Sequence, residues 1–348
     1  MKQTIVIRAA ALRTALALLL ILCVAGVPSL SARQQQAATE EKVEVLPVQG
    51  NVYMIAGAGA NITVQVGDDY VIVVDTGIPQ KSAEVLAAIH KITDKHILFI
   101  INTSADTDHT GGNENLSKAG WALPDLSLSP LLKSGREGLE LQPGSSIIAH
   151  INVLDRMGAP AGKQPASPHA SWPSDTYETD EWKLYNGEGI FIFHPPNAHT
   201  DGDSYVLFRK SDVISTGDIL TFDTYPVIKA EQGGSINGLI DALNQIIALL
   251  EAKESEEGGT YIIPGHGHIC DRNDIVNYRD MVTIIRGRIQ DLVNKGMTLE
   301  QVQAAKTTVD YDGIFGATSG PWTTDMFVAA VYRDLSKGKA PQKAGSGR

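Results

Sequence analysis

Cysteine is nearly absent from this 348-residue chain, which contains only Cys23 and Cys270. Because Cys23 lies in an N-terminal segment that we expect to be removed, the mature chain keeps one thiol and has no intramolecular disulfide. Positive charge is also scarce, since 29 Lys and Arg residues face 40 Asp and Glu residues and the net charge is −11. An acidic chain disfavours nucleic acid and anionic membrane surfaces as partners. Without disulfides, the fold must be stabilised by its hydrophobic core, and a bound metal ion is the other candidate stabiliser.

Two common catalytic motifs are missing as well. The chain has no nucleophile elbow that presents a catalytic serine and no glycine-rich loop that cradles phosphate, and Gly57-Ala58-Gly59 is only a turn. Hydrophobic residues at 43% and charged residues at 20% are present at the levels of an ordinary folded protein. The chemistry of this chain must therefore come from other side chains.

The N-terminus has the three parts of a secretory signal peptide. Three basic residues precede the uninterrupted apolar run Ala15–Val27, and Pro28–Ala32 then supplies small residues for cleavage. An uncleaved membrane anchor is the alternative, but the run is shorter than the ~20 residues that a spanning helix needs. We expect residues 1–32 to be a signal peptide, whose removal takes away three positive charges and moves the net charge to −14. The mature protein is then periplasmic or secreted, without stable membrane insertion.

Strand-forming and helix-forming segments alternate in two runs along the rest of the chain. Short segments rich in β-branched residues predict strands, and apolar residues spaced by three and four predict helices. Strands are predicted over residues 43–47, 52–55, 61–66, 70–74, 97–101, 146–149, 190–194, 204–209, 213–215 and 261–263. Helices are predicted over residues 82–92, 151–157, 237–250, 274–294 and 299–306, with one more around Leu116.

This order of elements predicts an α+β fold in one domain over residues 43–336. Two runs of strands, each followed by helices, indicate two sheets packed face to face with helices outside. Residues 33–42 are interpreted as a linker, and residues 337–348, rich in Lys, Gly and Ser, as a disordered tail. Trp121–Gly144 and Gly158–Ser174 lack periodicity, and long irregular stretches of this kind in a compact domain are usually functional or mobile.

The most informative segment runs from Asn102 to Asn113 and contains Asp106, Asp108 and His109. It directly follows the apolar run Ile97–Ile101, so a buried strand ends in a polar turn that enters a helix through two glycines. Imidazole and carboxylate ligands of a metal ion converge from strand ends, on loops stiffened by Gly and Pro. The segment therefore predicts part of a metal site.

Four further polar segments are each predicted to follow the end of a strand. They are Asp75-Thr76-Gly77, Asn197–Asp203, Ser215–Asp218 and Pro264–Gly267. A lone Asp or His at a strand end is more often part of a capped turn. Several such segments in order, each after an apolar run, instead indicate one shared site for a divalent metal ion.

Asn102–Asn113 resembles the T-H-x-H-x-D-H-x-G-G-N signature of the metallo-β-lactamase superfamily, and the other segments extend the resemblance over Val43–Leu335. The resemblance implies a four-layer αββα sandwich with a two-metal site at one edge of the sheets. Thr224-Tyr225-Pro226, Gly233-Gly234-Ser235 and His150 with Asn152-Val153 are similar to a subgroup of broad-specificity hydrolases near the glyoxalase II-like members.

The resemblance also assigns metal ligands to two neighbouring positions joined by one carboxylate. The first position takes Ser104, Asp106 and His199, the second takes Asp108, His109 and His266, and the bridge is Asp218. Asp108 would also orient the attacking water and carry its proton, which makes it the catalytic residue. Asp75 would steady the ligand loop, and His150 and Tyr225 would border the pocket. The implied reaction is hydrolysis of an ester, thioester, lactone or β-lactam carbonyl in a small-molecule substrate by metal-activated water.

Ser104 and Asp106 depart from the signature, which has histidine at both positions. A neutral hydroxyl is a weak zinc ligand, and a carboxylate replaces a neutral donor with a negative one. Three outcomes are open: one ion at the second position, two ions with the first held by Asp106, His199 and water, or a folded binding relative with weak or lost catalysis. Zinc is the expected ion. A carboxylate also suits iron or manganese, and an iron redox site, as in flavodiiron relatives with Glu at this position, is a further alternative.

Overall fold

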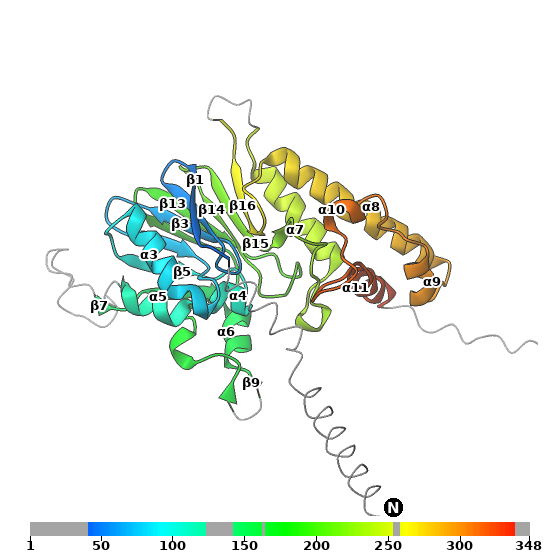
Figure 1. The fold of residues 1–348 in the computed structure, drawn as a ribbon, viewed down its shortest axis with the longest axis horizontal. Coiled ribbons are helices and arrows are strands. Elements are labelled where there is room, and N and C mark those ends of the chain that lie inside the picture. The colour runs from blue at the N-terminus through cyan, green and yellow to red at the C-terminus, as the bar shows by residue number, and fades with distance from the viewer. Residues whose placement is uncertain (1–40, 123–141, 162–163, 253–257, 338–348) are drawn as a thin grey trace, which may run out of the picture. The chain divides into compact units, whose positions relative to one another are not determined.

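The computed structural model describes residues 41–122, 142–161, 164–252 and 258–337 (Figure 1). The predicted signal peptide 1–32, nearly all of the predicted linker and nearly all of the predicted tail lie outside the described residues. The described elements belong to one compact unit that begins at Glu41. Among the helices that the structure describes, none is long and apolar enough to cross a membrane.

Seven strands form the first sheet, in the order β1-β2-β3-β4-β5-β8-β11. The strands from β1 to β4 pair antiparallel, and those from β4 onward pair parallel. Their bounds are β1 Glu44–Gln49, β2 Val52–Ala56, β3 Ile62–Val66, β4 Val71–Val74, β5 Ile97–Ile101, β8 Ser146–His150 and β11 Asp175–Tyr177. The strands predicted over residues 61–66 and 70–74 are confirmed as β3 and β4, which pair antiparallel.

Five strands form the second sheet, in the order β12-β13-β14-β15-β16, with only β15 and β16 pairing parallel. Their bounds are β12 Glu181–Tyr185, β13 Glu188–Phe193, β14 Tyr205–Phe208, β15 Val213–Thr221 and β16 Tyr261–His266. Two short antiparallel pairs are separate from both sheets. They join β6 (Trp121–Ala122) to β7 (Gln142–Pro143), and β9 (Pro160–Ala161) to β10 (Gln164–Pro165).

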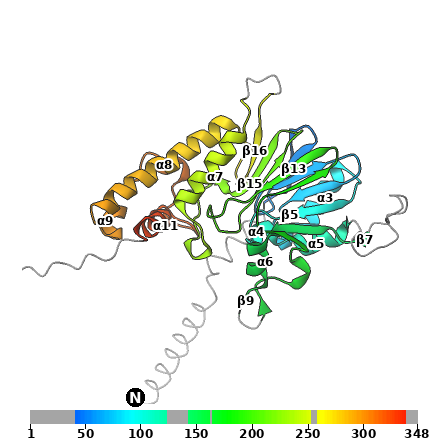
Figure 2. The same cartoon turned by 180° about the vertical axis from the view of Figure 1, so that it is seen from behind.

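Helices cover the outer face of each sheet, as Figure 1 shows and Figure 2 shows from behind. α3 and α5 lie over the first sheet, and α7, α8 and α11 lie over the second. The helix bounds are α3 Ser82–Ile92, α4 Thr107–Thr110, α5 Asn113–Ala119, α6 Ile151–Gly158, α7 Ile236–Leu249, α8 Arg272–Asn294, α9 Leu299–Ala304, α10 Asp312–Phe315 and α11 Thr324–Ser336. Short 3-10 segments cover Pro79–Lys81, His169–Ser171 and Ala230–Gln232.

Alternate residues of the central strands face opposite layers, and this alternation places the core. In β4, Ile72 and Val74 belong to the core between the two sheets, whereas Val71 and Val73 pack toward α3. β14 divides its side chains in the same way between the inter-sheet core and a core under α7, α8 and α11. Strands covered on both faces bury every residue, which is why these segments are continuous apolar runs. The predicted four-layer αββα arrangement of an α+β fold is confirmed.

The sequence pattern misses β11 and β12. In the edge strand β12 the apolar residues Trp182 and Leu184 point to solvent, with 64% and 69% of their surface exposed. Because these apolar residues face away from any core, alternation gives no sign of a buried face. The predicted loop Gly158–Ser174 contains β9, β10 and one 3-10 segment, and most of Trp121–Gly144 lies outside the described residues.

The prediction that Asp218 follows the end of a strand is wrong. β15 continues to Thr221, and Asp218 lies inside it, at an irregularity where the pairing with β16 shifts on both sides of Gly217. Gly217 has a φ of +51°, a left-handed conformation that glycine adopts without steric penalty. An irregularity of this kind re-aims the neighbouring side chain, and here that side chain is the Asp218 carboxylate.

Gly217→Ala is expected to destabilise the protein more than an ordinary left-handed glycine substitution does. An alanine in this conformation costs about 1–2 kcal/mol, and a methyl group at residue 217 would also overlap the side chain of Thr103. Such overpacking adds about 1–3 kcal/mol. Chemical denaturation measures the difference against Gly187→Ala, because Gly187 has a φ of +75° and nothing within 4 Å of an added methyl group. Equal losses in the two variants would contradict the overlap.

Candidate metal centre

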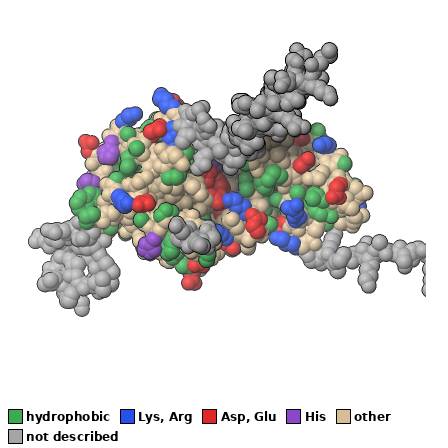
Figure 3. All heavy atoms as spheres, turned by 60° about the horizontal axis from the view of Figure 1, so that its bottom comes forward, with side chains coloured by type: hydrophobic (Ala, Val, Ile, Leu, Met, Phe, Trp, Pro, Cys, Tyr) green, Lys and Arg blue, Asp and Glu red, His purple; other side chains and the backbone are tan. Residues whose placement is uncertain are grey.

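The predicted metal-binding side chains converge at one edge of the two sheets. They are Asp106, Asp108 and His109 at α4, His199 before β14, Asp218 within β15 and His266 at the end of β16. Because β4 and β5 run parallel, as do β15 and β16, the carboxyl ends of these strands meet at this edge. Figure 3, which looks at the side carrying α4 and α6, shows acidic and basic side chains close together near the middle of the described surface.

The second predicted metal position is assembled from Asp108, His109, His266 and Asp218. Nε2 of His266 lies 3.2 Å from Oδ2 of Asp108 and 3.5 Å from Oδ1 of Asp218. Nε2 of His109 lies 3.1 Å from the same Asp218 oxygen. The ligand atoms of Asp108, His109 and His266 lie within 4.8 Å of one another, close to the spread of ligands around one ion at about 2 Å.

Asp106, His199 and Asp218 form the other group, at the first predicted metal position. Nε2 of His199 lies 3.4 Å from Oδ2 of Asp106 and 3.9 Å from Oδ2 of Asp218. Asp218 therefore offers Oδ1 to one group and Oδ2 to the other, which is the place of a bridging carboxylate. The ammonium of Lys229 also contacts Oδ2 of Asp106, a partner that the sequence pattern does not indicate.

Unsatisfied buried atoms test whether a metal ion fits these residues. Nε2 of His109, Nε2 of His199 and Oδ1 of Asp218 are buried and have no hydrogen-bond partner among the described residues. Such atoms are rare in folded proteins, and imidazole nitrogen with carboxylate oxygen is a donor set of zinc and similar divalent metals. Gly265 keeps this space open, since a Cβ there would lie 2.5 Å from Oδ1 of Asp218. The second position therefore fits a divalent ion.

Asp75 fixes the orientation of His109. Oδ2 of Asp75 accepts a hydrogen bond from Nδ1 of His109 at 2.7 Å, and the backbone amide and hydroxyl of Thr103 bind the same carboxylate at 2.8 and 2.6 Å. A carboxylate that holds Nδ1–H leaves Nε2 free to bind metal. Asp75 is 1% exposed and has a φ of +63°, a strained conformation of the kind that clusters at functional sites.

Asp203 plays the same part for His199, and sequence reasoning gave it no role. Oδ1 of Asp203 lies 3.3 Å from Nδ1 of His199, and the carboxylate also accepts bonds from the amide and hydroxyl of Thr200 at 2.7 and 2.6 Å. The sequence signal that could have identified Asp203 is its position four residues after His199, in a polar turn.

Asn61 is a second residue that the sequence pattern misses. Its side-chain amide donates to the carbonyl oxygens of Pro264 at 3.0 Å and Gly267 at 2.9 Å, and its backbone amide donates to Gly265 at 2.8 Å. These bonds tie the loop that carries His266 to the first sheet. No sequence signal identifies this contact, because the partners are about two hundred residues apart.

Charge coupling raises the pKa of each histidine in the cluster. Burial by itself would lower the pKa of His109, but the carboxylates of Asp218 and Asp75 outweigh it and hold the pKa well above its usual value. The same balance of burial against carboxylates raises the pKa values of His199 and His266. Burial would raise the pKa of Asp218, but His109 keeps it well below its usual value.

Ser104 and His150 both shape the turns next to the cluster. The Ser104 hydroxyl accepts a hydrogen bond from the backbone amide of Asp106 at 3.3 Å, so it supports the turn that carries this carboxylate. His150 caps the start of α6, where its Nδ1 accepts from the Asn152 amide at 3.2 Å. Burial lowers the pKa of His150.

Tyr225 is not brought to the cluster. Its buried ring stacks on Phe327 of α11 with ring centroids 4.8 Å apart. Its hydroxyl bonds to the carbonyl of Thr308 at 3.1 Å and to Asp312 at 2.9 Å. The expected pocket role is therefore replaced by a packing role, in which Tyr225 anchors the C-terminal helices to the second sheet.

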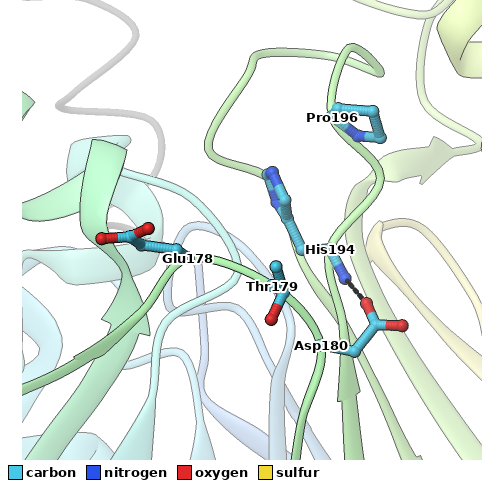
Figure 4. A pocket seen from close by; sticks show the side chains of 5 residues that line it. All are labelled: Glu178, Thr179, Asp180, His194 and Pro196. Carbon is cyan, nitrogen blue, oxygen red and sulfur yellow. Dashed lines mark hydrogen bonds between the residues drawn. The ribbon is translucent and has the colours of Figure 1, made fainter.

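A surface cavity of about 550 Å³ adjoins the loop that carries His199. Its lining residues are Glu178, Thr179, Asp180, His194 and Pro196 (Figure 4). Nδ1 of His194 donates to the carbonyl of Asp203 at 2.8 Å, and its ring stacks on His150 with centroids 3.6 Å apart. The cavity is thus linked through Asp203 to the metal cluster, although none of its lining residues belongs to either ligand group.

The fold and the cluster together define an αββα protein with imidazole and carboxylate metal ligands at one edge of its sheets. The chain belongs to the metallo-beta-lactamase superfamily, whose sequence profile matches residues 47–266. The match ends at His266, so it includes every candidate ligand and stops before α8. The recognised family and fold class agree with the resemblance drawn from the sequence.

Three solved structures to which the chain is similar are each distant in sequence. The stereoselective inverting sec-alkylsulfatase Pisa1 from Pseudomonas sp. is 16% identical, with a TM-score of 0.58 over 88% of this chain and 52% of that chain. The DIM-1 metallo-beta-lactamase is 17% identical, with a TM-score of 0.49 over 70% of this chain and 97% of that one. The metallo-beta-lactamase from Pontibacter korlensis is 13% identical, with a TM-score of 0.49 over 70% of this chain and 99% of that one. The alkylsulfatase likeness supports the fold alone. No curated protein sequence matches the chain significantly.

Proposed function

We propose that the protein is a metal-dependent hydrolase with at least one divalent ion held by Asp108, His109, His266 and Asp218. The observation that supports this most strongly is the pair of buried atoms without hydrogen-bond partners among the described residues, Nε2 of His109 and Oδ1 of Asp218, which lie 3.1 Å apart. When bound, the ion lowers the pKa of a water molecule to about 7 and polarises the carbonyl under attack. Zinc is the proposed ion, with iron or manganese as alternatives for a carboxylate-rich site.

Asp108 is the residue that we propose to move protons. Its side chain is 36% exposed, beside His266 at 27%, so both face the open side of the cluster. Burial would raise the pKa of Asp108, but the hydrogen bond with His266 holds it below its usual value. An aspartate carboxylate is ionised at neutral pH, so Asp108 would accept a proton from the attacking water and pass it to the leaving group.

The proposed substrates are small molecules with an ester, thioester, lactone or β-lactam carbonyl. This range follows from the superfamily resemblance, and the closer likeness to glyoxalase II-like members stays a prediction. The loops that would select among these substrates are Trp121–Gly144, most of which lies outside the described residues, and Gly158–Ser174.

Metal analysis combined with a hydrolysis panel tests the proposed function. The purified protein is expected to contain stoichiometric metal and to turn over a lactam, lactone, thioester or ester, and chelation is expected to remove both properties. A well-folded protein with neither metal nor turnover would falsify the proposal and support a non-catalytic binding relative. Iron with an oxygen- or peroxide-dependent spectrum would support the redox alternative instead.

We also propose that the protein is exported, on the sequence pattern of residues 1–32. Expression of the full chain in a bacterial host is expected to give a periplasmic or secreted protein whose N-terminal sequence begins at Arg33. Leu20→Arg places a charge in the apolar run and is expected to block export. A full-length wild-type protein that stays in the cytoplasm would contradict the assignment.

A further inference from the structure

We propose that the ammonium group of Lys229 takes the place of a second metal ion, so that the centre binds one divalent ion, at Asp108, His109, His266 and Asp218. This inference rests on the proposed metal-dependent function. It specifies what occupies the half of the site where the family signature is altered.

Lys229 contacts the ligand atom that a second ion would need. Its Nζ pairs with Oδ2 of Asp106, and the same oxygen lies 3.4 Å from Nε2 of His199. The two paired side chains are only 25% and 18% exposed, so water and salt screen their charges less than on an open surface. An ammonium and a divalent cation at one oxygen would compete for its lone pairs and repel each other.

The backbone holds Lys229 directly against the ligand loop. Its amide donates to the carbonyl of His199 at 3.0 Å, and its own carbonyl accepts from the amides of Gln232 at 2.8 Å and Gly234 at 3.0 Å. Gly234 permits this close approach, since a Cβ at that residue would overlap the His199 carbonyl oxygen. The backbone of Lys229 is therefore held beside the loop that carries His199, from where its side chain contacts Asp106.

The altered signature residues and Lys229 complement each other. A carboxylate at residue 106 supplies the negative partner that an ammonium requires, which a histidine at that position would not supply. With Asp106 bound to Lys229 and no histidine at Ser104, the first position keeps His199 and the shared Asp218 as donors. Two protein donors are fewer than the three or four that zinc sites use.

Zinc stoichiometry tests the inference without reference to activity. The purified protein is freed of metal and loaded with Zn²⁺, and bound zinc per chain is measured by plasma mass spectrometry after gel filtration. The wild type and His199→Ala are each expected to bind one zinc ion, and His266→Ala almost none. Lys229→Met is expected to bind two, because Asp106, His199 and Asp218 then form a three-ligand site of the kind that holds catalytic zinc.

Lys183→Met is the matched control for the lysine substitution. Lys183 is 22% exposed and pairs with Asp175 at 3.4 Å, so it resembles Lys229 in burial and pairing but belongs to neither ligand group. This variant is expected to keep one zinc ion. Lys229→Gln, which removes the charge and keeps a polar side chain, is expected to bind two ions like Lys229→Met, so that misfolding of one variant does not decide the result.

Each remaining outcome of the zinc measurement overturns a stated claim. Two zinc ions in the wild type, reduced to one in His199→Ala, would overturn the inference and leave the proposed function intact. One zinc ion in folded Lys229→Met and Lys229→Gln would overturn the role given to Lys229. No bound metal in any variant, after loading with zinc, iron and manganese in turn, would overturn the proposed function, and the inference with it.

Discussion

His266→Ala is expected to remove the bound metal ion and to lower kcat/KM by at least about 10³-fold for any substrate that the hydrolysis panel identifies. His266 links two other ligands of the second position, with Nε2 at 3.2 Å from Asp108 and 3.5 Å from Asp218. Lewis-acid stabilisation by a metal ion is worth several kcal/mol, and each ~1.4 kcal/mol changes a rate tenfold. Metal content and steady-state kinetics of the purified variant measure the two effects.

His268→Ala is the control for damage to the loop itself. His268 lies two residues further along the same loop, is exposed, and packs on Phe222 with ring centroids 4.8 Å apart. This variant is expected to keep the metal ion and the activity. If His266→Ala retained both while remaining folded, the second position would not be the catalytic metal site.

Asp75→Asn is expected to weaken zinc binding by about 10–100-fold, although Asp75 is not a ligand. Its carboxylate holds Nδ1 of His109 at 2.7 Å and two groups of Thr103 at 2.8 and 2.6 Å. Asparagine lacks the negative charge that favours the metal-binding orientation of His109. Where its side-chain NH2 group faces Nδ1–H of His109, two donors meet and no hydrogen bond forms. Asparagine also tolerates the left-handed backbone at this residue, so the change isolates the carboxylate. Competition titration against a zinc chelator measures the affinity.

Asp203→Asn is the matched comparison, because Asp203 holds Nδ1 of His199 at 3.3 Å in the same manner. In a one-ion centre at the second position, this variant is expected to bind zinc as tightly as the wild type. An equal loss of affinity in both variants would mean that His199 also binds zinc, which would contradict the one-ion centre.

Elements with a strong local pattern could be predicted from the sequence. The helix Ser82–Ile92 and the strand Ile97–Ile101 have the predicted bounds, because apolar periodicity and buried β-branched residues act over a few neighbouring positions. The edge strand β12 could not be predicted, since its apolar residues face solvent. The extension of β15 past Gly217 could not be predicted either, because it depends on pairing with β16.

The residues of the candidate site likewise divide into those that the sequence reveals and those that only the structure reveals. Asp106, Asp108 and His109 are visible in one short segment, and their motif extends to His199, Asp218 and His266 by resemblance. Lys229 and Asn61 carry no such signal, because their partners Asp106 and Pro264 are 123 and 203 residues away. Only chain folding brings such groups within hydrogen-bond distance.

The sequence by itself determined the fold class, the superfamily and the identity of the candidate ligands, because these follow from periodicity and from motifs in short segments. The tertiary structure decided which outer carboxylate holds each histidine, Asp75 for His109 and Asp203 for His199. It also placed Lys229 against Asp106. That contact turns an apparent defect of the signature into a charge-paired half of the site, since electrostatic partners are selected by distance in space and not by distance along the chain.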